Sequence, residues 1–239
     1  MDETRTAPTA ATLRAPWRAV WRPSWWLMPG LPLLLLVFLT VNVVAHGPLL
    51  GLDRWIRDAV QAQANSAAWR WVGDTRSSPA QILVDIADNQ VAIPVLAVCA
   101  LVAVARRQSL RPLLAAGTGL VLLLVTVIAG KVLIGRPGPG PTSAHIPSGG
   151  LGVFPSGHTT RASVCYVLSA LLLAPEVSAR LRRVLMVAAG VLCFVVGLAL
   201  IWCNYHWFTD VVAGWALAAI IIQICLAIAG PREVPARSP

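Results

Sequence analysis

Charged residues are scarce in this chain: they make up 12% of its 239 residues, whereas apolar residues make up 57% and the mean hydropathy is +0.71. This balance excludes a soluble globular domain and a disordered chain, because neither carries so large an apolar fraction. The composition therefore predicts an integral membrane protein. The formal net charge is +9, but the basic residues lie in short runs between apolar segments. We therefore expect lipid headgroups, and no nucleic acid, as their anionic partners.

Lysine is rarer still, because 19 residues are lysine or arginine and Lys131 is the only lysine among them. The five cysteines lie in or beside apolar segments without the paired spacing of metal ligands, and the sequence has no histidine-rich cluster. Such cysteines are typical of small buried apolar side chains. The sequence thus predicts neither a bound metal nor another cofactor.

Apolar segments long enough to cross a bilayer as helices recur along the chain. Between the first two, residues 51–89 mix charged and apolar residues at helical spacing, which is typical of amphipathic helices at the membrane interface. The predicted fold class is an all-α polytopic membrane helical bundle over residues 25–230, with tails at 1–24 and 231–239. We expect six transmembrane helices, at about 27–45, 90–105, 112–134, 159–174, 184–203 and 207–229.

Arginines concentrate in the N-terminal tail and in the connections at 106–111 and 180–183. Because cytoplasmic connections retain positive charge, these three regions and both termini are predicted to be cytoplasmic. The opposite ends of the helices then face the extracytoplasmic side of a bacterial-type plasma (cell inner) membrane.

Three polar clusters stand at those extracytoplasmic ends. They are KVLIGRPGP from Lys131 to Pro139, PSGH from Pro155 to His158, and HWFTD from His206 to Asp210. Ionisable residues are costly at membrane depth and mark function by default. We therefore expect the three clusters to form one site.

His206 and Asp210 are four residues apart, a spacing that places two residues on one face of a helix. The carboxylate can then accept a hydrogen bond from one imidazole nitrogen and leave the other nitrogen free, as in an oriented nucleophile or base. The alternative is structural, with Asp210 in the first turn of a helix stabilising the positive end of the helix dipole.

Ser156, Gly157 and His158 precede the fourth predicted helix, where backbone amides beside a hydroxyl group favour an anion such as phosphate. The alternative is an ordinary serine cap followed by a turn. Lys131 either neutralises phosphate together with Arg136 or extends its amine to the membrane surface.

A lysine, then PSGH, then His-x-x-x-Asp, in this order, resembles the membrane-bound type 2 phosphatidic acid phosphatase (PAP2) family, over roughly residues 90–229. The resemblance implies six helices, no metal, and hydrolysis of a lipid phosphate or pyrophosphate. By this resemblance, His206 attacks phosphorus to form a phosphohistidine, Asp210 orients His206, and His158 protonates the leaving oxygen. It further implies that the phosphate oxygens are held by Lys131, Ser156 and the amide of Gly157.

Two arginines of the family motifs are absent. The first motif has a lysine, six residues and then Arg-Pro, and Gly138 stands where that arginine is expected. The third motif has an arginine six positions before its histidine, and Leu200 stands there. Arg136 and Arg161 are the candidate substitutes for binding phosphate. In the alternative, Arg136 faces solvent and Arg161 lies at the interface.

Three activities follow from this pattern. The first is a membrane lipid phosphate phosphatase acting on phosphatidate, phosphatidylglycerol phosphate or a polyprenyl (pyro)phosphate. The missing arginines favour the second, a non-hydrolytic relative that binds or moves a phospholipid or polyprenyl phosphate. The third is a phosphotransferase that passes the phosphoryl group to an acceptor other than water. In each, the expected partners are a lipid phosphate and the surrounding membrane lipids.

Overall fold

The structure is a computed structural model that describes residues 30–73, 78–140 and 151–230, so the predicted tails at 1–24 and 231–239 lie outside the described residues. Every regular element within the described ranges is helical, which confirms the predicted all-α class. The α-helices are α2 (Gly30–Val44), α3 (Leu49–Ala64), α4 (Pro79–Ile86), α5 (Asn89–Arg107), α6 (Arg111–Ile134), α7 (Gly157–Ala162), α8 (Leu168–Leu173), α9 (Ala179–Trp202) and α10 (Phe208–Ala229). Two short 3-10 helices, η3 (Arg70–Val72) and η6 (Ala174–Glu176), and one π-helix, η5 (Ser163–Val167), complete the described elements.

Helices α5, α6, α9 and α10 are each long and apolar enough to cross a membrane. Helices α2 and α3 meet this criterion only as a pair, and the chain bends by 87° between them. The span predicted at 159–174 corresponds to α7, η5 and α8 in succession. The count of six spans therefore stays a prediction. Large apolar side chains such as Leu114, Leu133 and Val187 are exposed on the described helices, as expected where a helix faces lipid.

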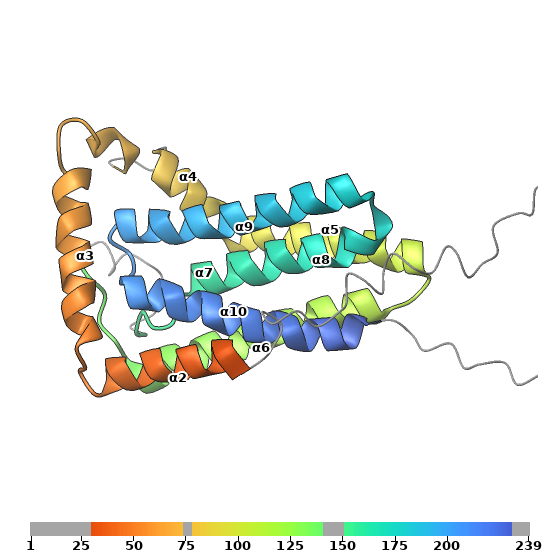
Figure 1. Ribbon diagram of the computed structural model, residues 1–239, viewed down its shortest axis with the longest axis horizontal. Coiled ribbons are helices and arrows are strands. Elements are labelled where there is room, and N and C mark those ends of the chain that lie inside the picture. Colours follow the sequence, from red (N-terminus) through yellow and green to blue (C-terminus); the bar gives the residue numbers. More distant parts are fainter. Residues whose placement is uncertain (1–29, 74–77, 141–150, 231–239) are drawn as a thin grey trace, which may run out of the picture.

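The helices form a bundle with one helix laid across its end. In Figure 1, α2, α5, α6, α8, α9 and α10 run along the long axis of the molecule, and α3 crosses one end. Helix α10 packs against α6 and α2 and is the most buried of the four long apolar helices. One apolar cluster joins α5, α8 and α10 through Leu96, Leu168 and Ile221. A second joins α9 to the start of α10 through Val196 and Val211.

Helix α3 has the amphipathic character that the sequence predicts for residues 51–89. Ile56 and Val60 pack against the second apolar cluster, whereas Trp55 and Asp58 are exposed. The C-terminal end of α6 and the N-terminal ends of α7 and α10 lie at the end of the bundle that α3 crosses (Figure 1). The arginine-rich connections predicted at 106–111 and 180–183 include the end of α5, the start of α6 and the start of α9. These helix ends lie at the opposite end of the bundle (Figure 1). The fold therefore separates the polar clusters from the arginine-rich connections.

Candidate active site

The three polar clusters meet at the end of the bundle that α3 crosses. The backbone amide of Ser156 donates to the carbonyl oxygen of Asp210 at 3.1 Å, so the turn before α7 lies against the first turn of α10. Gly214 permits this approach, because a Cβ at that position would lie 3.0 Å from the carbonyl oxygen of Ser156. Lys131, in the last turn of α6, is close to Gly157, since a Cβ on Gly157 would lie 3.9 Å from Lys131 Cε.

His206 and Asp210 form a buried pair at the start of α10. Nδ1 of His206 lies 3.4 Å from Oδ2 of Asp210, and the two residues are only 2% and 0% exposed. Nε2 of His206 is buried and has no hydrogen-bond partner among the described residues. Asp210 also accepts from the backbone amide of Trp207 at 3.1 Å and lies in the first turn of α10. The capping arrangement and the orientation of His206 thus occur together, because one carboxylate serves both.

The surroundings of His206 favour its neutral form. Burial lowers the pKa of His206, and the charges of His158 and Lys131 act in the same direction, against the hydrogen bond and negative charge of Asp210. With Nδ1–H directed at Asp210, the neutral imidazole carries its lone pair on Nε2 at pH 7. That nitrogen is therefore suited to attack an electrophile.

Arg136 is buried, at 7% exposure, and does not face solvent. Its Nη1 donates to Asp210 Oδ1 at 2.5 Å and to Thr209 Oγ1 at 2.7 Å. The backbone at Arg136 is bonded to a later part of the chain, because the amide of Val153 donates to the carbonyl of Arg136 at 2.8 Å. A Cβ on Gly152 would lie 2.6 Å from the Arg136 nitrogen, so only glycine allows this close approach.

Asp53 of α3 completes this network, and the sequence did not single it out. It is 1% exposed, and its Oδ2 accepts from Arg136 Nη2 at 2.6 Å. The same carboxylate accepts from the backbone amide of Thr209 at 2.9 Å and from its hydroxyl at 2.6 Å. A signal was present in the sequence, because Asp53 precedes Ile56 by three residues and Val60 by seven. A carboxylate there lies on the apolar face of an amphipathic helix.

His158 also has a carboxylate partner that was not predicted from the sequence. Nε2 of His158 lies 3.0 Å from Oδ1 of Asp88, the residue that precedes α5. The hydrogen bond to His158 lowers the pKa of Asp88, although partial burial opposes this shift. Ser156 caps α7, because its Oγ accepts from the amide and the hydroxyl of Thr159 at 3.3 and 2.9 Å. Its own hydroxyl hydrogen remains able to donate.

Arg161 extends from α7 toward the residues that begin α5. Its Nε donates to the carbonyl oxygen of Ala87 at 2.5 Å, Nη1 donates to Asn89, and Nη2 lies 3.8 Å from Asp88. These contacts place Arg161 beside the pair of His158 and Asp88. Lys131 also interacts electrostatically with Arg161 and with Asp210.

Leu200, at the position of the missing arginine, is fully buried. It belongs to the apolar cluster that also contains Val196 and Val211. A guanidinium group there would be desolvated without a partner in that cluster, which is costly. The environment of α9 in this protein therefore matches a leucine.

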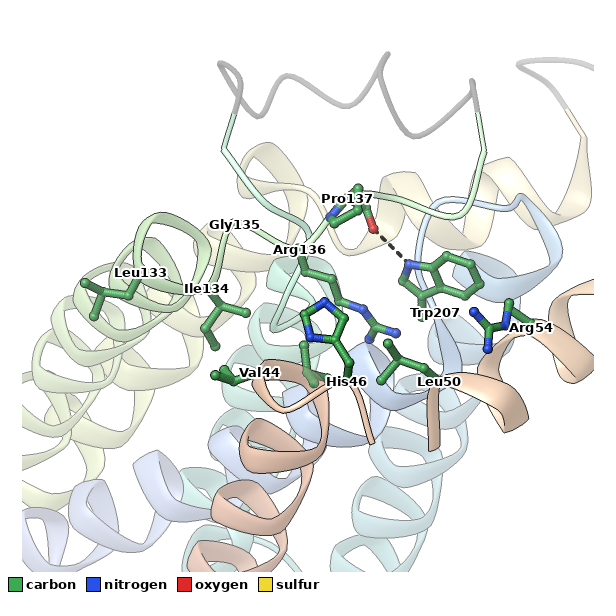
Figure 2. A pocket seen from close by; sticks show the side chains of 11 residues that line it. Val44, His46, Leu50, Arg54, Leu133, Ile134, Gly135, Arg136, Pro137 and Trp207 are labelled. Atoms are coloured by element: carbon green, nitrogen blue, oxygen red, sulfur yellow. Dashed lines mark hydrogen bonds between the residues drawn. The ribbon is translucent and has the colours of Figure 1, made fainter. Parts of the chain in front are cut away.

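A cavity of about 420 Å³ adjoins the site (Figure 2). Its walls combine apolar side chains, including Val44, Leu133 and Ile134, with cationic or polar ones, which are His46, Arg54, Arg136 and Trp207. Arg54 is exposed and makes no hydrogen bond or ion pair with other described residues. This size and mixed lining are typical of a binding site for a small amphipathic molecule.

Comparison with known proteins agrees with the fold and with the family that the sequence resembles. The family model of the PAP2 superfamily matches residues 112–233, which is more than half of the chain. No curated protein matches the sequence. The fold is similar to the crystal structure of a transmembrane PAP2-type phosphatidylglycerolphosphate phosphatase from Bacillus subtilis, with a TM-score of 0.68 and 19% identity. That likeness covers 82% of this chain and 94% of the other.

The protein is thus a polytopic all-α membrane protein with a histidine-containing site at one end of its bundle. The chain belongs to the PAP2 superfamily.

Proposed function

We propose that this protein hydrolyses the phosphate or pyrophosphate ester of a membrane lipid through a phosphohistidine intermediate. The observation that carries the proposal is the buried, unpartnered Nε2 of His206, whose Nδ1 faces Asp210. A neutral imidazole held in this tautomer is a nucleophile with one free nitrogen. His158 and Lys131 lie near enough to influence the charge of His206.

In the first step, Nε2 of His206 forms a bond to phosphorus while the bond from phosphorus to the lipid oxygen breaks. His158 donates a proton to the departing oxygen, so the lipid leaves as a neutral alcohol or, from a pyrophosphate, as a protonated monophosphate. Because Nε2 of His158 faces Asp88, Nδ1 is the nitrogen left for this transfer. The carboxylate of Asp210 stabilises the positive charge that forms on the phosphorylated imidazole.

In the second step, water attacks the phosphohistidine while His158, now neutral, accepts a proton from it. The phosphorus–nitrogen bond breaks, inorganic phosphate leaves, and His206 and His158 return to their starting protonation states. In such two-step reactions one residue commonly acts as the acid in the first step and as the base in the second.

The phosphate oxygens are held, in this proposal, by Lys131, the amide of Gly157, the Ser156 hydroxyl and Arg161. Arg136 contributes its positive charge in the resting state, because its Nη1 and Nη2 already donate to the carboxylates of Asp210 and Asp53. Preorganised donors of this kind stabilise a transferring phosphoryl group.

The substrate is a lipid because the site lies at the end of a bundle of membrane helices, beside an amphipathic cavity. Val44, Leu133 and Ile134 offer apolar surface for the chain of the lipid, and Arg54 offers a cation for its headgroup (Figure 2). Phosphatidate, phosphatidylglycerol phosphate and polyprenyl (pyro)phosphates share this combination of an anionic head and an apolar tail.

We further propose that the site faces the extracytoplasmic side of the plasma membrane and that both termini are cytoplasmic. The support is the separation of charge in the fold, because the arginine-rich connections lie at the end opposite α3 (Figure 1). Positively charged connections are retained in the cytoplasm.

The test is phosphate release by the purified protein in mixed micelles containing each of these lipids, with and without orthovanadate. His206→Ala is expected to reduce release by at least about 10³-fold. Asp58→Asn, which removes an exposed carboxylate of α3, is the matched control and should keep wild-type activity. Turnover by His206→Ala at the wild-type rate would overturn the phosphohistidine mechanism.

A non-hydrolytic binder is the second candidate, and the buried Leu200 in place of the arginine of the motif is the observation that favours it. Loss of a phosphate-binding donor typically costs about 2.7–4 kcal/mol of transition-state stabilisation. Binding of the lipid phosphate is measured in the same mixed micelles. Saturable binding without phosphate release would favour this candidate over the phosphatase.

A further inference from the structure

Four charged or ionisable groups form one continuous network at the start of α10. Arg136 donates hydrogen bonds to the carboxylates of Asp53 and Asp210, and Asp210 faces Nδ1 of His206. All four residues are at most 7% exposed. Thr209 makes a second connection between Asp53 and Arg136, because it donates to Asp53 and accepts from Arg136. Helix α3 therefore reaches the candidate nucleophile through a single guanidinium group.

The charge of this network is unbalanced. It contains two carboxylates and one guanidinium, which pairs with both of them, beside a neutral imidazole, so the formal charge is −1. With Asp210 and Arg136 alone, the sum would be zero. The second carboxylate, from Asp53, supplies the excess negative charge.

We propose that Asp53 is a positioning residue that shares Arg136 with Asp210 and thereby maintains a net negative charge beside His206. The inference rests on the proposed function, in which attack by Nε2 of His206 creates a positive charge on the imidazole ring. A buried negative charge stabilises that cation most strongly because little water screens it. Arg136, at its displaced position in the motif, holds the two carboxylates together.

Other charged groups also face His206, and they act in the opposite direction. Lys131 from α6 and His158 from α7 each disfavour a positive charge on His206. Arg161, also on α7, is directed toward Asp88 and Asn89 at the start of α5. The last turn of α9 carries no basic residue. Asp53 thus offsets cations that the phosphate itself requires.

A purely structural role for Asp53 predicts a different result, which makes the two roles separable. Asp53 docks α3 onto α10 through Thr209, so its removal could loosen the site and admit water. Under this structural role, water that enters the site would raise the pKa of His206 toward its ordinary value. Substitution of Asp53 and substitution of Arg136 would then both raise it. Under the charge-sharing role, however, the two substitutions move the pKa of His206 in opposite directions.

The experiment is a pH titration of histidine-labelled full-length protein in detergent micelles, followed by NMR, with the His206 signal assigned from the spectrum of His206→Gln. Asp53→Asn removes a negative charge and is expected to lower the pKa of His206 by about 0.5–1 unit. Arg136→Gln removes a positive charge and is expected to raise it by a similar amount. Asp53→Glu should return the pKa toward the wild-type value, and Asp58→Asn, on the same helix but exposed, should leave it unchanged.

Turnover of phosphatidate in mixed micelles is measured on the same variants. Asp53→Asn is expected to lower kcat by about three- to tenfold with little change in KM, because the charge acts on the phosphorylated imidazole. The pKa measurement needs no turnover, so an inactive wild-type protein would defeat the proposed function without deciding the role of Asp53. An unchanged or raised pKa of His206 in Asp53→Asn would overturn the charge-sharing inference.

Discussion

Two histidine–carboxylate pairs stand at the same end of the bundle, and they differ in their access to water. His206 and Asp210 are 2% and 0% exposed, whereas the side chains of His158 and Asp88 are 17% and 46% exposed. The buried pair comes from one turn at the start of α10, and the exposed pair joins α7 to the residue that precedes α5. Identical chemical groups are therefore placed in two different dielectric environments.

This difference supports the two roles proposed above. A histidine needs an unprotonated nitrogen to act as a nucleophile, and burial lowers the pKa of His206 in favour of that form. His158 donates a proton and later accepts one from the attacking water, and its partial exposure gives water access to the imidazole. Because both residues are histidines, their exposure is what distinguishes the proposed nucleophile from the proposed acid.

The largest effect after loss of His206 is expected from His158→Ala. Phosphate release from phosphatidate should fall by about 10³-fold, because the alkoxide must then leave without a proton. With an aryl phosphate as substrate, whose leaving group needs no proton, the rate of the variant should fall much less. The ratio of the two rates is the measurement, and equal losses on both substrates would remove His158 from the role of acid.

A smaller loss, of about 10²-fold, is expected for Asp210→Asn. The side-chain amide of the new asparagine can donate to Nδ1 of His206. This favours the tautomer with hydrogen on Nε2, and a protonated Nε2 has no lone pair for attack. Steady-state kinetics should show a fall in kcat greater than any change in KM. Activity equal to wild type would mean that Asp210 has only a structural role, as a cap of α10 and a partner of Arg136.

The smallest effect is expected for Asp88→Asn, and it depends on pH. The hydrogen bond to His158 lowers the pKa of Asp88, so its stabilising contribution is complete above the unfolded value, near pH 4. That contribution is lost as the pH falls through the lowered value. At pH 7 the variant should be less stable by under about 1 kcal/mol, because the pair is partly exposed.

Thermal unfolding of both proteins in the same detergent at pH 7 and at pH 3 provides the check. The difference in unfolding temperature between wild type and Asp88→Asn should narrow at pH 3. A constant difference across this range would show that Asp88 contributes through packing and not through its charge.

The order of motifs in the sequence indicated the site, because each cluster is local. PSGH and HWFTD each span at most five residues, so the residues within each motif are close together whatever the fold. Apolar segments of bilayer length likewise predicted α5, α6, α9 and α10. The partners Asp53 and Asp88 were not identified, because they meet Arg136 and His158 across 83 and 70 residues of chain.

The sequence by itself determined that the chain is a helical membrane protein and that its polar clusters share one end of the bundle, since both follow from hydropathy and from the length of each span. Only the tertiary structure decided which charges are paired. Arg136, two residues from its expected position, is held by Asp53 and Asp210. The physical reason is that the strength of a charge pair depends on distance and burial, and packing of α3 across the bundle sets both.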